Sequence, residues 1–129
     1  MVSKKRITST MRSALINASK IHNVPLDKLR LKINIKNDEA ICVALNSIEI
    51  LDIVEWGDVC GVGKSDIFGV ANIVKDKIKS KLKSLAKLHS FTMETINVRV
   101  YAKDEEGNPS LFIYENGKPF KKMSIEEII

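Results

Sequence analysis

Strict alternation between apolar and polar residues in two separate stretches constrains the fold of this 129-residue chain more than any other feature. Residues 29–36 carry leucine or isoleucine at every odd position and arginine, lysine or asparagine at every even one. Residues 95–103 show the same period of two. Because successive side chains of a strand point to opposite faces, each stretch predicts a strand with one buried and one polar face. Such strands are typical of an antiparallel sheet covered on one side.

A turn and a returning strand are expected after the first alternating stretch. Asn37 and Asp38 are turn formers, so residues 39–45 are predicted to run back beside it. We expect the larger apolar residues of this strand to face the core and its small residues to face away, with Ile41, Val43 and Leu45 inside and Cys42 and Ala44 outside. Residues 48–56 suit a strand or a short helix, and the three-residue spacing of their acidic side chains favours the helix.

The second alternating stretch is followed by two further turn signals. A polar loop over residues 104–109 leads to a strand predicted over residues 110–115. Asn116 and Gly117 then predict a tight turn into a short third strand over residues 118–123.

Two segments have the 3.6-residue period of an amphipathic helix. The first covers residues 8–23 and ends before Pro25, and the second covers residues 66–89. A hydroxyl residue is expected to cap each helix: Thr8, Ser9 or Thr10 the first, and Ser65 the second.

The order of these elements predicts a single α+β domain over residues 1–129, with an antiparallel sheet built from two hairpins and two main amphipathic helices packed on one face. No internal repeat or linker is apparent. No apolar run approaches the roughly 20 residues of a membrane-spanning helix, and no signal peptide is visible. The expected location is the cytoplasm, where thiols stay reduced.

Charge is unevenly distributed along the chain, whose net charge is +5. Residues 1–26 contain no acid, residues 37–63 contain no base, and residues 75–87 are strongly basic again. Lysines four apart on the long helix repel one another, which costs a few tenths of a kcal/mol per pair. Contact with phosphates would relieve this repulsion and release counterions.

The charge pattern favours a non-enzymatic protein that binds the phosphate backbone of DNA or RNA through a lysine-rich helix. Aromatic residues make up only 5% of the chain, so base stacking is expected to contribute little. The candidate contact residues lie on the long helix and near the N-terminus: Lys75, Lys77, Lys79, Lys81, Lys83, Lys87, Lys4, Lys5, Arg6 and Arg12.

A second interpretation of the same charges is self-association. The basic helix of one copy would meet the acidic stretch 38–58 of the next, and apolar C-terminal residues would pack on a partner. These residues are Ile125, Ile128 and Ile129. The chain would then be an oligomeric structural or assembly protein, such as a component of a phage particle, with no nucleic-acid role.

A third interpretation is a degenerate phosphate-binding loop in front of the long helix. Its residues are Gly61, Gly63, Lys64 and Ser65, and helix N-termini attract anions. The full pattern requires a glycine where Asp58 stands, and the remaining chain is too short for the usual parallel sheet. Nucleotide binding is therefore the weakest of the three interpretations.

No set of side chains meets the geometric roles of a catalytic site, so we expect neither enzymatic activity nor a cofactor. Cys42, Cys60, His22 and His89 lack the close spacing of zinc ligands, and no metal site is expected. The acidic stretch 38–58 is interpreted as a solvated surface.

Overall fold

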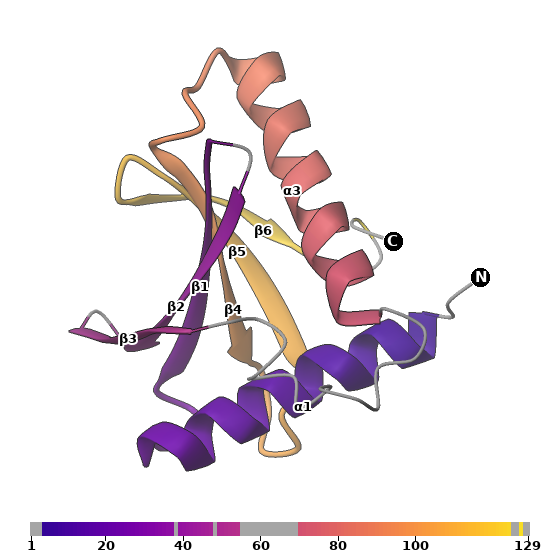
Figure 1. Ribbon diagram of the computed structural model, residues 1–129, viewed down its shortest axis with the longest axis vertical. Coiled ribbons are helices and arrows are strands. Elements are labelled where there is room, and N and C mark those ends of the chain that lie inside the picture. Colours follow the sequence, from indigo (N-terminus) through magenta and orange to yellow (C-terminus); the bar gives the residue numbers. More distant parts are fainter. Residues whose placement is uncertain (1–3, 38, 48, 55–69, 125–126, 128–129) are drawn as a thin grey trace.

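The computed structural model describes residues 4–37, 39–47, 49–54, 70–124 and 127 of the chain (Figure 1). Over these residues the fold is α+β, with a six-stranded antiparallel sheet and two helices. In chain order the elements are α1 (Lys4–His22), β1 (Leu29–Lys36), β2 (Glu39–Asn46), β3 (Glu49–Val54), α3 (Val70–His89), β4 (Ile96–Ala102), β5 (Pro109–Glu115) and β6 (Lys118–Met123). Neither described helix is both long and apolar enough to cross a membrane.

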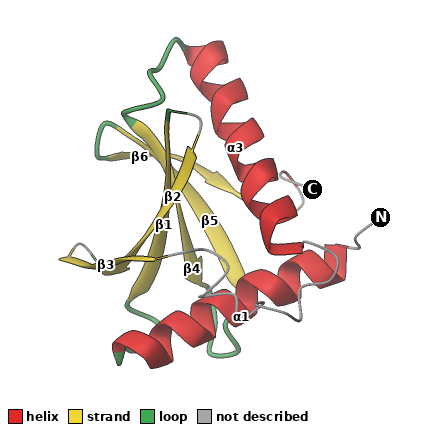
Figure 2. Ribbon diagram, in the orientation of Figure 1, coloured by secondary structure: helices red, strands yellow, loops and turns green. Residues whose placement is uncertain are grey.

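The sheet consists of two three-stranded meanders joined in the middle. The strand order is β3-β2-β1-β4-β5-β6, so only the central β1–β4 pair joins strands that are not consecutive in the chain. β1 and β4 run antiparallel, with Leu31 opposite Val100 and Ile33 opposite Val98. Figure 2 shows this twisted sheet beside α1 and α3.

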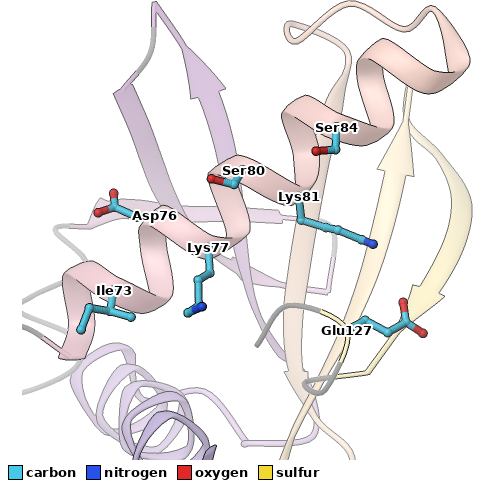
Figure 3. A pocket seen from close by; sticks show the side chains of 7 residues that line it. All are labelled: Ile73, Asp76, Lys77, Ser80, Lys81, Ser84 and Glu127. Carbon is cyan, nitrogen blue, oxygen red and sulfur yellow. The ribbon is translucent and has the colours of Figure 1, made fainter. Parts of the chain in front are cut away.

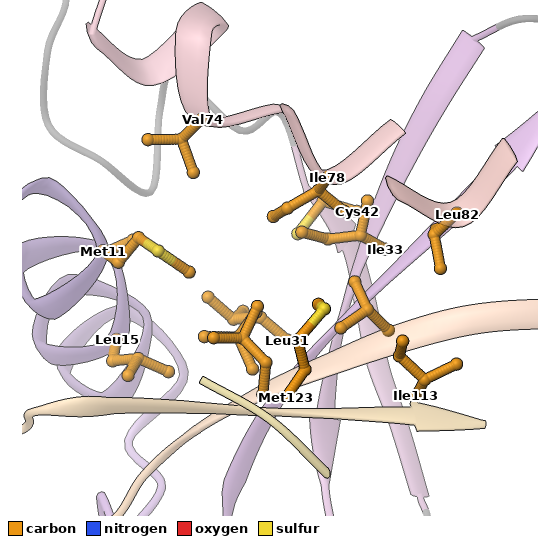
Figure 4. Close-up of a cluster of buried hydrophobic side chains, with 14 of the residues drawn as sticks. Met11, Leu15, Leu31, Ile33, Cys42, Val74, Ile78, Leu82, Ile113 and Met123 are labelled. Atoms are coloured by element: carbon orange, nitrogen blue, oxygen red, sulfur yellow. The ribbon is translucent and has the colours of Figure 1, made fainter. Parts of the chain in front are cut away.

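The predicted alternation divides β1 and β4 into two faces. Leu31 and Ile33 of β1 and Val98 of β4 are almost completely buried, whereas the residues between them are only partly buried. These buried residues belong to one core cluster with Met11 of α1 and Ile78 of α3 (Figure 4). We call the sheet face that carries Leu31, Ile33 and Val98 the inner face, and the opposite one the outer face.

The side chains of β2 face the other way from the prediction. Cys42 pairs with Ile33 and Ala44 with Leu31, and directly opposed residues share a face of the sheet. Cys42 and Ala44 therefore lie on the inner face and belong to the core cluster, from which Figure 4 labels Cys42. The prediction was wrong because β2 is apolar on both faces, so its own pattern does not determine its register.

Residues 49–54 form the edge strand β3, so the preference for a helix over residues 48–56 was wrong. Ile50 pairs with Leu45 and Ile53 with Val43. The ladder with β2 satisfies the backbone hydrogen bonds that a short isolated helix would leave exposed, and β-branched residues suit a strand. The three-residue spacing of the acids was coincidental.

The helix α1 is already formed at Lys4, and the predicted caps lie within it. Thr8 Oγ1 donates to the Lys4 carbonyl at 2.9 Å, and Thr10 Oγ1 donates to the Arg6 carbonyl at 3.0 Å. Hydroxyls make such bonds inside helices, so these residues are not caps. The predicted cap Ser65 lies outside the described residues.

Among the described elements the order helix, strand, strand, strand occurs twice, although no internal repeat is apparent in the sequence. Each helix ends at a histidine, and the residue after it has a positive φ: 53° at Asn23 and 58° at Ser90. The amide of the following residue donates a hydrogen bond to a carbonyl in the last turn of the helix. Val24 N donates to Ser19 O at 3.0 Å, and Phe91 N donates to Ala86 O at 2.8 Å. Both bonds have the spacing of a Schellman motif.

The strands of the two halves repeat as well. Each half has a residue with positive φ after its second strand, at Ser47 and at Asn116. The amide of this residue donates to the residue before the first strand of the same half, from Ser47 N to Lys28 O at 2.8 Å and from Asn116 N to Thr95 O at 2.7 Å. Counted from the helix ends at His22 and His89, Lys32 of β1 is equivalent to Arg99 of β4, and these two residues pair directly. An approximate two-fold axis therefore passes through that pair.

Candidate nucleic-acid interface

The lysines of α3 lie on two flanks of the helix. Its buried stripe contains Val74, Ile78 and Leu82. With about 3.6 residues per turn, Lys75, Lys79 and Lys83 fall on one side of this stripe, and Lys77 and Lys81 on the other. Lys87 points away from the stripe and is exposed. The six lysines therefore occupy both flanks and the exposed side of α3.

One flank borders a hollow between α3 and Glu127. The hollow has a volume of about 470 Å³, and Figure 3 shows Lys77, Lys81 and Glu127 on its lining. Glu127 also forms an exposed ion pair with Lys121 at 3.7 Å. The rest of the α3 side consists of Ile73, Asp76, Ser80 and Ser84. The charges on its lining are therefore balanced, with Lys77 and Lys81 against the carboxylates of Asp76 and Glu127.

The other flank begins with Lys75, which is half-buried close to Cys42. Burial raises the pKa of the Cys42 thiol to about 12, and the positive charge of Lys75 offsets only part of this rise. The thiol therefore stays protonated at neutral pH and is a poor nucleophile. Cys42 packs in the core and adds no reactive group to the lysines.

The basic N-terminal residues lie at the start of α1. Lys4, Lys5 and Arg6 are exposed, and Figure 1 shows this end of α1 next to the first turns of α3. Arg12 is half-buried farther along, where its Cγ would lie 3.4 Å from a Cβ at Gly107. The first three residues can therefore act together with α3, whereas Arg12 packs on the β4–β5 loop.

The outer face of the sheet gathers basic and aromatic side chains that the sequence analysis did not identify. Because directly opposed residues share a face, one row can be followed across all six strands. From β3 to β6 it contains Ile53, Val43, Lys32, Arg99, Phe112 and Lys122. The middle of the row therefore places two cations beside an aromatic ring.

Cation–π contacts link the basic and aromatic residues of the outer face. Arg30 Cζ lies 5.0 Å from the centroid of the Tyr101 ring, and Arg99 Cζ lies 4.0 Å from that of Tyr114. The Phe112 and Tyr114 rings are 5.8 Å apart. All five side chains are half-buried. They form a semi-rigid layer, since each planar group supports another.

Two polar atoms on this face have no hydrogen-bond partner among the described residues. They are Asn97 Oδ1 and Arg99 Nε, both buried atoms of half-buried side chains. Buried polar atoms in folded proteins nearly always have a partner, so these two atoms mark a place where a polar ligand would be favourable.

Among the described residues, the remaining candidates and the two histidines form no assembled site. Residues 61–65, Cys60 and residues 125, 128 and 129 lie outside the described part of the chain. His22 and His89 end α1 and α3, and those helix ends lie at separate corners of the molecule (Figure 1). The described residues contain no cluster of three or more histidine, cysteine or acidic side chains suited to a metal ion.

Two basic surfaces thus remain as candidates, one formed by α3 with the start of α1 and one on the outer face of the sheet. No protein-family model, curated protein or solved structure matches this chain.

Proposed function

We propose that this chain is a non-enzymatic, cytoplasmic protein that binds the phosphate backbone of DNA or RNA through the lysines of α3, helped by Lys4, Lys5 and Arg6. The observation that supports this proposal is the composition of α3, which carries six lysines and one acid, Asp76, over residues 70–89. The proposal takes both helices to cover the inner face of the sheet, so that α3 has its lysines at the molecular surface.

The arrangement of the lysines on two flanks is compatible with this role. A lysine is a point charge on a flexible stem, and its aliphatic part can lie along apolar surface while the ammonium group reaches outward. Lysines from both flanks can therefore approach phosphates that pass over the exposed side of α3. Such contacts depend on charge and not on base sequence, so binding should weaken steeply with salt.

The first experiment is fluorescence anisotropy of labelled duplex DNA, single-stranded DNA and RNA, titrated with the protein at several salt concentrations. The variant Lys77→Gln/Lys81→Gln/Lys83→Gln should lower the slope of log K against log salt by up to about 0.9 for each lost duplex-phosphate contact. A matched control, Lys20→Gln/Lys28→Gln/Lys118→Gln, removes the same charge from exposed positions outside α3. An equal change of slope in both variants, or no binding at low salt, would contradict the proposal.

Self-association is the second candidate, and the edge strand β3 favours it. Ile50 and Ile53 have exposed fractions of 65% and 71%, and β3 ends the sheet on its side. An exposed apolar edge strand is a template for pairing with another chain. The chain would then be a structural or assembly protein, with β3 as its contact.

The test of this second candidate is the molar mass of the native protein and of Ile53→Lys, measured by light scattering after size-exclusion chromatography over a range of concentrations. Assembly through β3 predicts an oligomer that Ile53→Lys converts to a monomer, because a buried lysine charge opposes the contact. A native protein that is monomeric at every concentration would rule this contact out.

A further inference from the structure

The centre of the outer face holds two like charges in direct opposition. Lys32 of β1 pairs with Arg99 of β4, and each is half-buried. Like charges directly opposite each other destabilise a sheet. The next residue across the row is Phe112, so no carboxylate follows Arg99 there. An anion placed over this pair would remove the repulsion.

The charged residues of the outer face are mostly basic. Among the described strand residues that the register places on it, the charged ones are Arg30, Lys32, Lys36, Arg99, Lys122 and the single acid Glu39. Glu39 lies opposite Lys36 at the far end of the β1–β2 ladder. The central part of this face therefore has uncompensated positive charge that is complementary to a polyanion.

Planar groups lie next to this charge. Tyr101, Phe112 and Tyr114 come from the adjacent strands β4 and β5, and arginines stack on both tyrosines. Bases of single-stranded nucleic acid stack on aromatic rings and on guanidinium planes. A duplex keeps its bases stacked on one another, so a layer of rings favours a single strand. The unpartnered Asn97 Oδ1 and Arg99 Nε can bond to base edges or phosphate oxygens.

We propose that the outer face of the sheet binds single-stranded nucleic acid. Bases would stack on the planar groups of Arg30, Tyr101, Phe112 and Tyr114, and phosphates would be held by Lys32, Arg99 and Lys122. This inference rests on the proposed nucleic-acid binding, but it assigns the bases to a surface other than α3. It differs from the expectation that base stacking contributes little, because three aromatic residues gather on one face.

The test compares anisotropy titrations of a single-stranded oligonucleotide of about 15 nucleotides and of the matching duplex. Tyr114→Leu and Phe112→Leu should each weaken single-strand binding about 10-fold, since stacking contributes on that order for each base. They should leave the salt slope unchanged, because they remove no charge. Phe91→Leu is the matched control, since Phe91 packs against His89 and Phe120 beyond the end of α3.

Circular dichroism and urea unfolding of each variant verify that the fold is retained, and Arg99→Gln supplies a second test that keeps every ring. It should weaken binding and also lower the salt slope by about 0.7 for a single strand. Unchanged affinity of the folded Tyr114→Leu, Phe112→Leu and Arg99→Gln variants would overturn the inference, as would tighter binding of the duplex. Equally tight binding of inorganic polyphosphate, without dependence on the rings, would also overturn it.

The outcomes separate this inference from the proposed role of α3. Loss of binding in the ring variants with an unchanged salt slope in the α3 variant would support the outer face and remove α3 from the interface. The reverse pattern would overturn the outer face and leave α3 as the binding surface. Absence of binding to all nucleic acids would overturn both.

Discussion

Individual residues in this protein differ in what their local pattern reveals. The charge of Lys32 and Arg99 is evident from the sequence, but their direct opposition depends on the pairing of β1 with β4. Cys42 is similar, because its depth in the core follows from its register against Ile33. For single residues, the sequence therefore gives the side-chain type, whereas its neighbours and its burial depend on the strand register of the fold.

Burial of Cys42 has a consequence for stability at high pH. Its pKa is raised from 9.0 to about 12, so the folded state keeps the thiol proton over a range in which the unfolded state loses it. The free energy of unfolding should therefore fall as pH rises above about 9, by up to about 1.4 kcal/mol per pH unit. Chemical denaturation of Cys60→Ala at pH 8 and pH 10 measures this fall.

The control for this prediction is Cys42→Ala/Cys60→Ala, which lacks the buried thiol and should lose less stability between the two pH values. Equal losses in the two proteins would show that Cys42 makes no contribution. A thiol reagent should also modify Cys42 in Cys60→Ala only after denaturant is added, since the native thiol is buried.

The elements show why some of the fold could be predicted and some could not. β1, β4 and both helices have clear periods of two or 3.6 residues, and the structure has these elements close to the predicted ranges. β2 and β3 lack such a period, because β2 is buried on both faces: Val43 is 7% and Leu45 2% exposed on the outer face. The facing of the β2 side chains and the strand conformation of β3 therefore depend on which strands pair. A local sequence pattern carries no information about this pairing.

The two helix ends lead to a prediction at this scale. Ser90 has a φ of 58°, a conformation that disfavours residues with a Cβ and suits glycine. Ser90→Gly should therefore raise the free energy of unfolding by about 0.5–1 kcal/mol. Asn23→Gly should raise it less, because asparagine tolerates positive φ better than serine. Urea unfolding midpoints measure both effects.

Ser84→Gly is the matched control, since Ser84 is exposed in the interior of α3, where glycine costs up to about 1 kcal/mol. The account of the helix ends would be wrong if Ser90→Gly lowered the unfolding midpoint as Ser84→Gly should.

At the scale of the whole molecule, the repeated order of elements is the main feature that the sequence conceals. Buried positions are equivalent but not identical, as at Met11 and Ile78, and the surface charges of the two halves differ. The similar endings, Ile21-His22 and Leu88-His89, were the available signal. The outer face was concealed for a related reason, because its residues come from strands far apart in the chain and meet only across the sheet.

The approximate two-fold axis has a consequence for any strand that lies across it. Lys32 and Arg99 are related by this axis, so rotation by 180° about it exchanges one positive charge with the other. Tyr101, Phe112 and Tyr114 all belong to the second half. The equivalent outer-face positions in β1 and β2 carry aliphatic or polar side chains, and none is aromatic. Phosphate contacts alone would thus accept a strand in either 5′-to-3′ polarity, and the one-sided rings would select between the two.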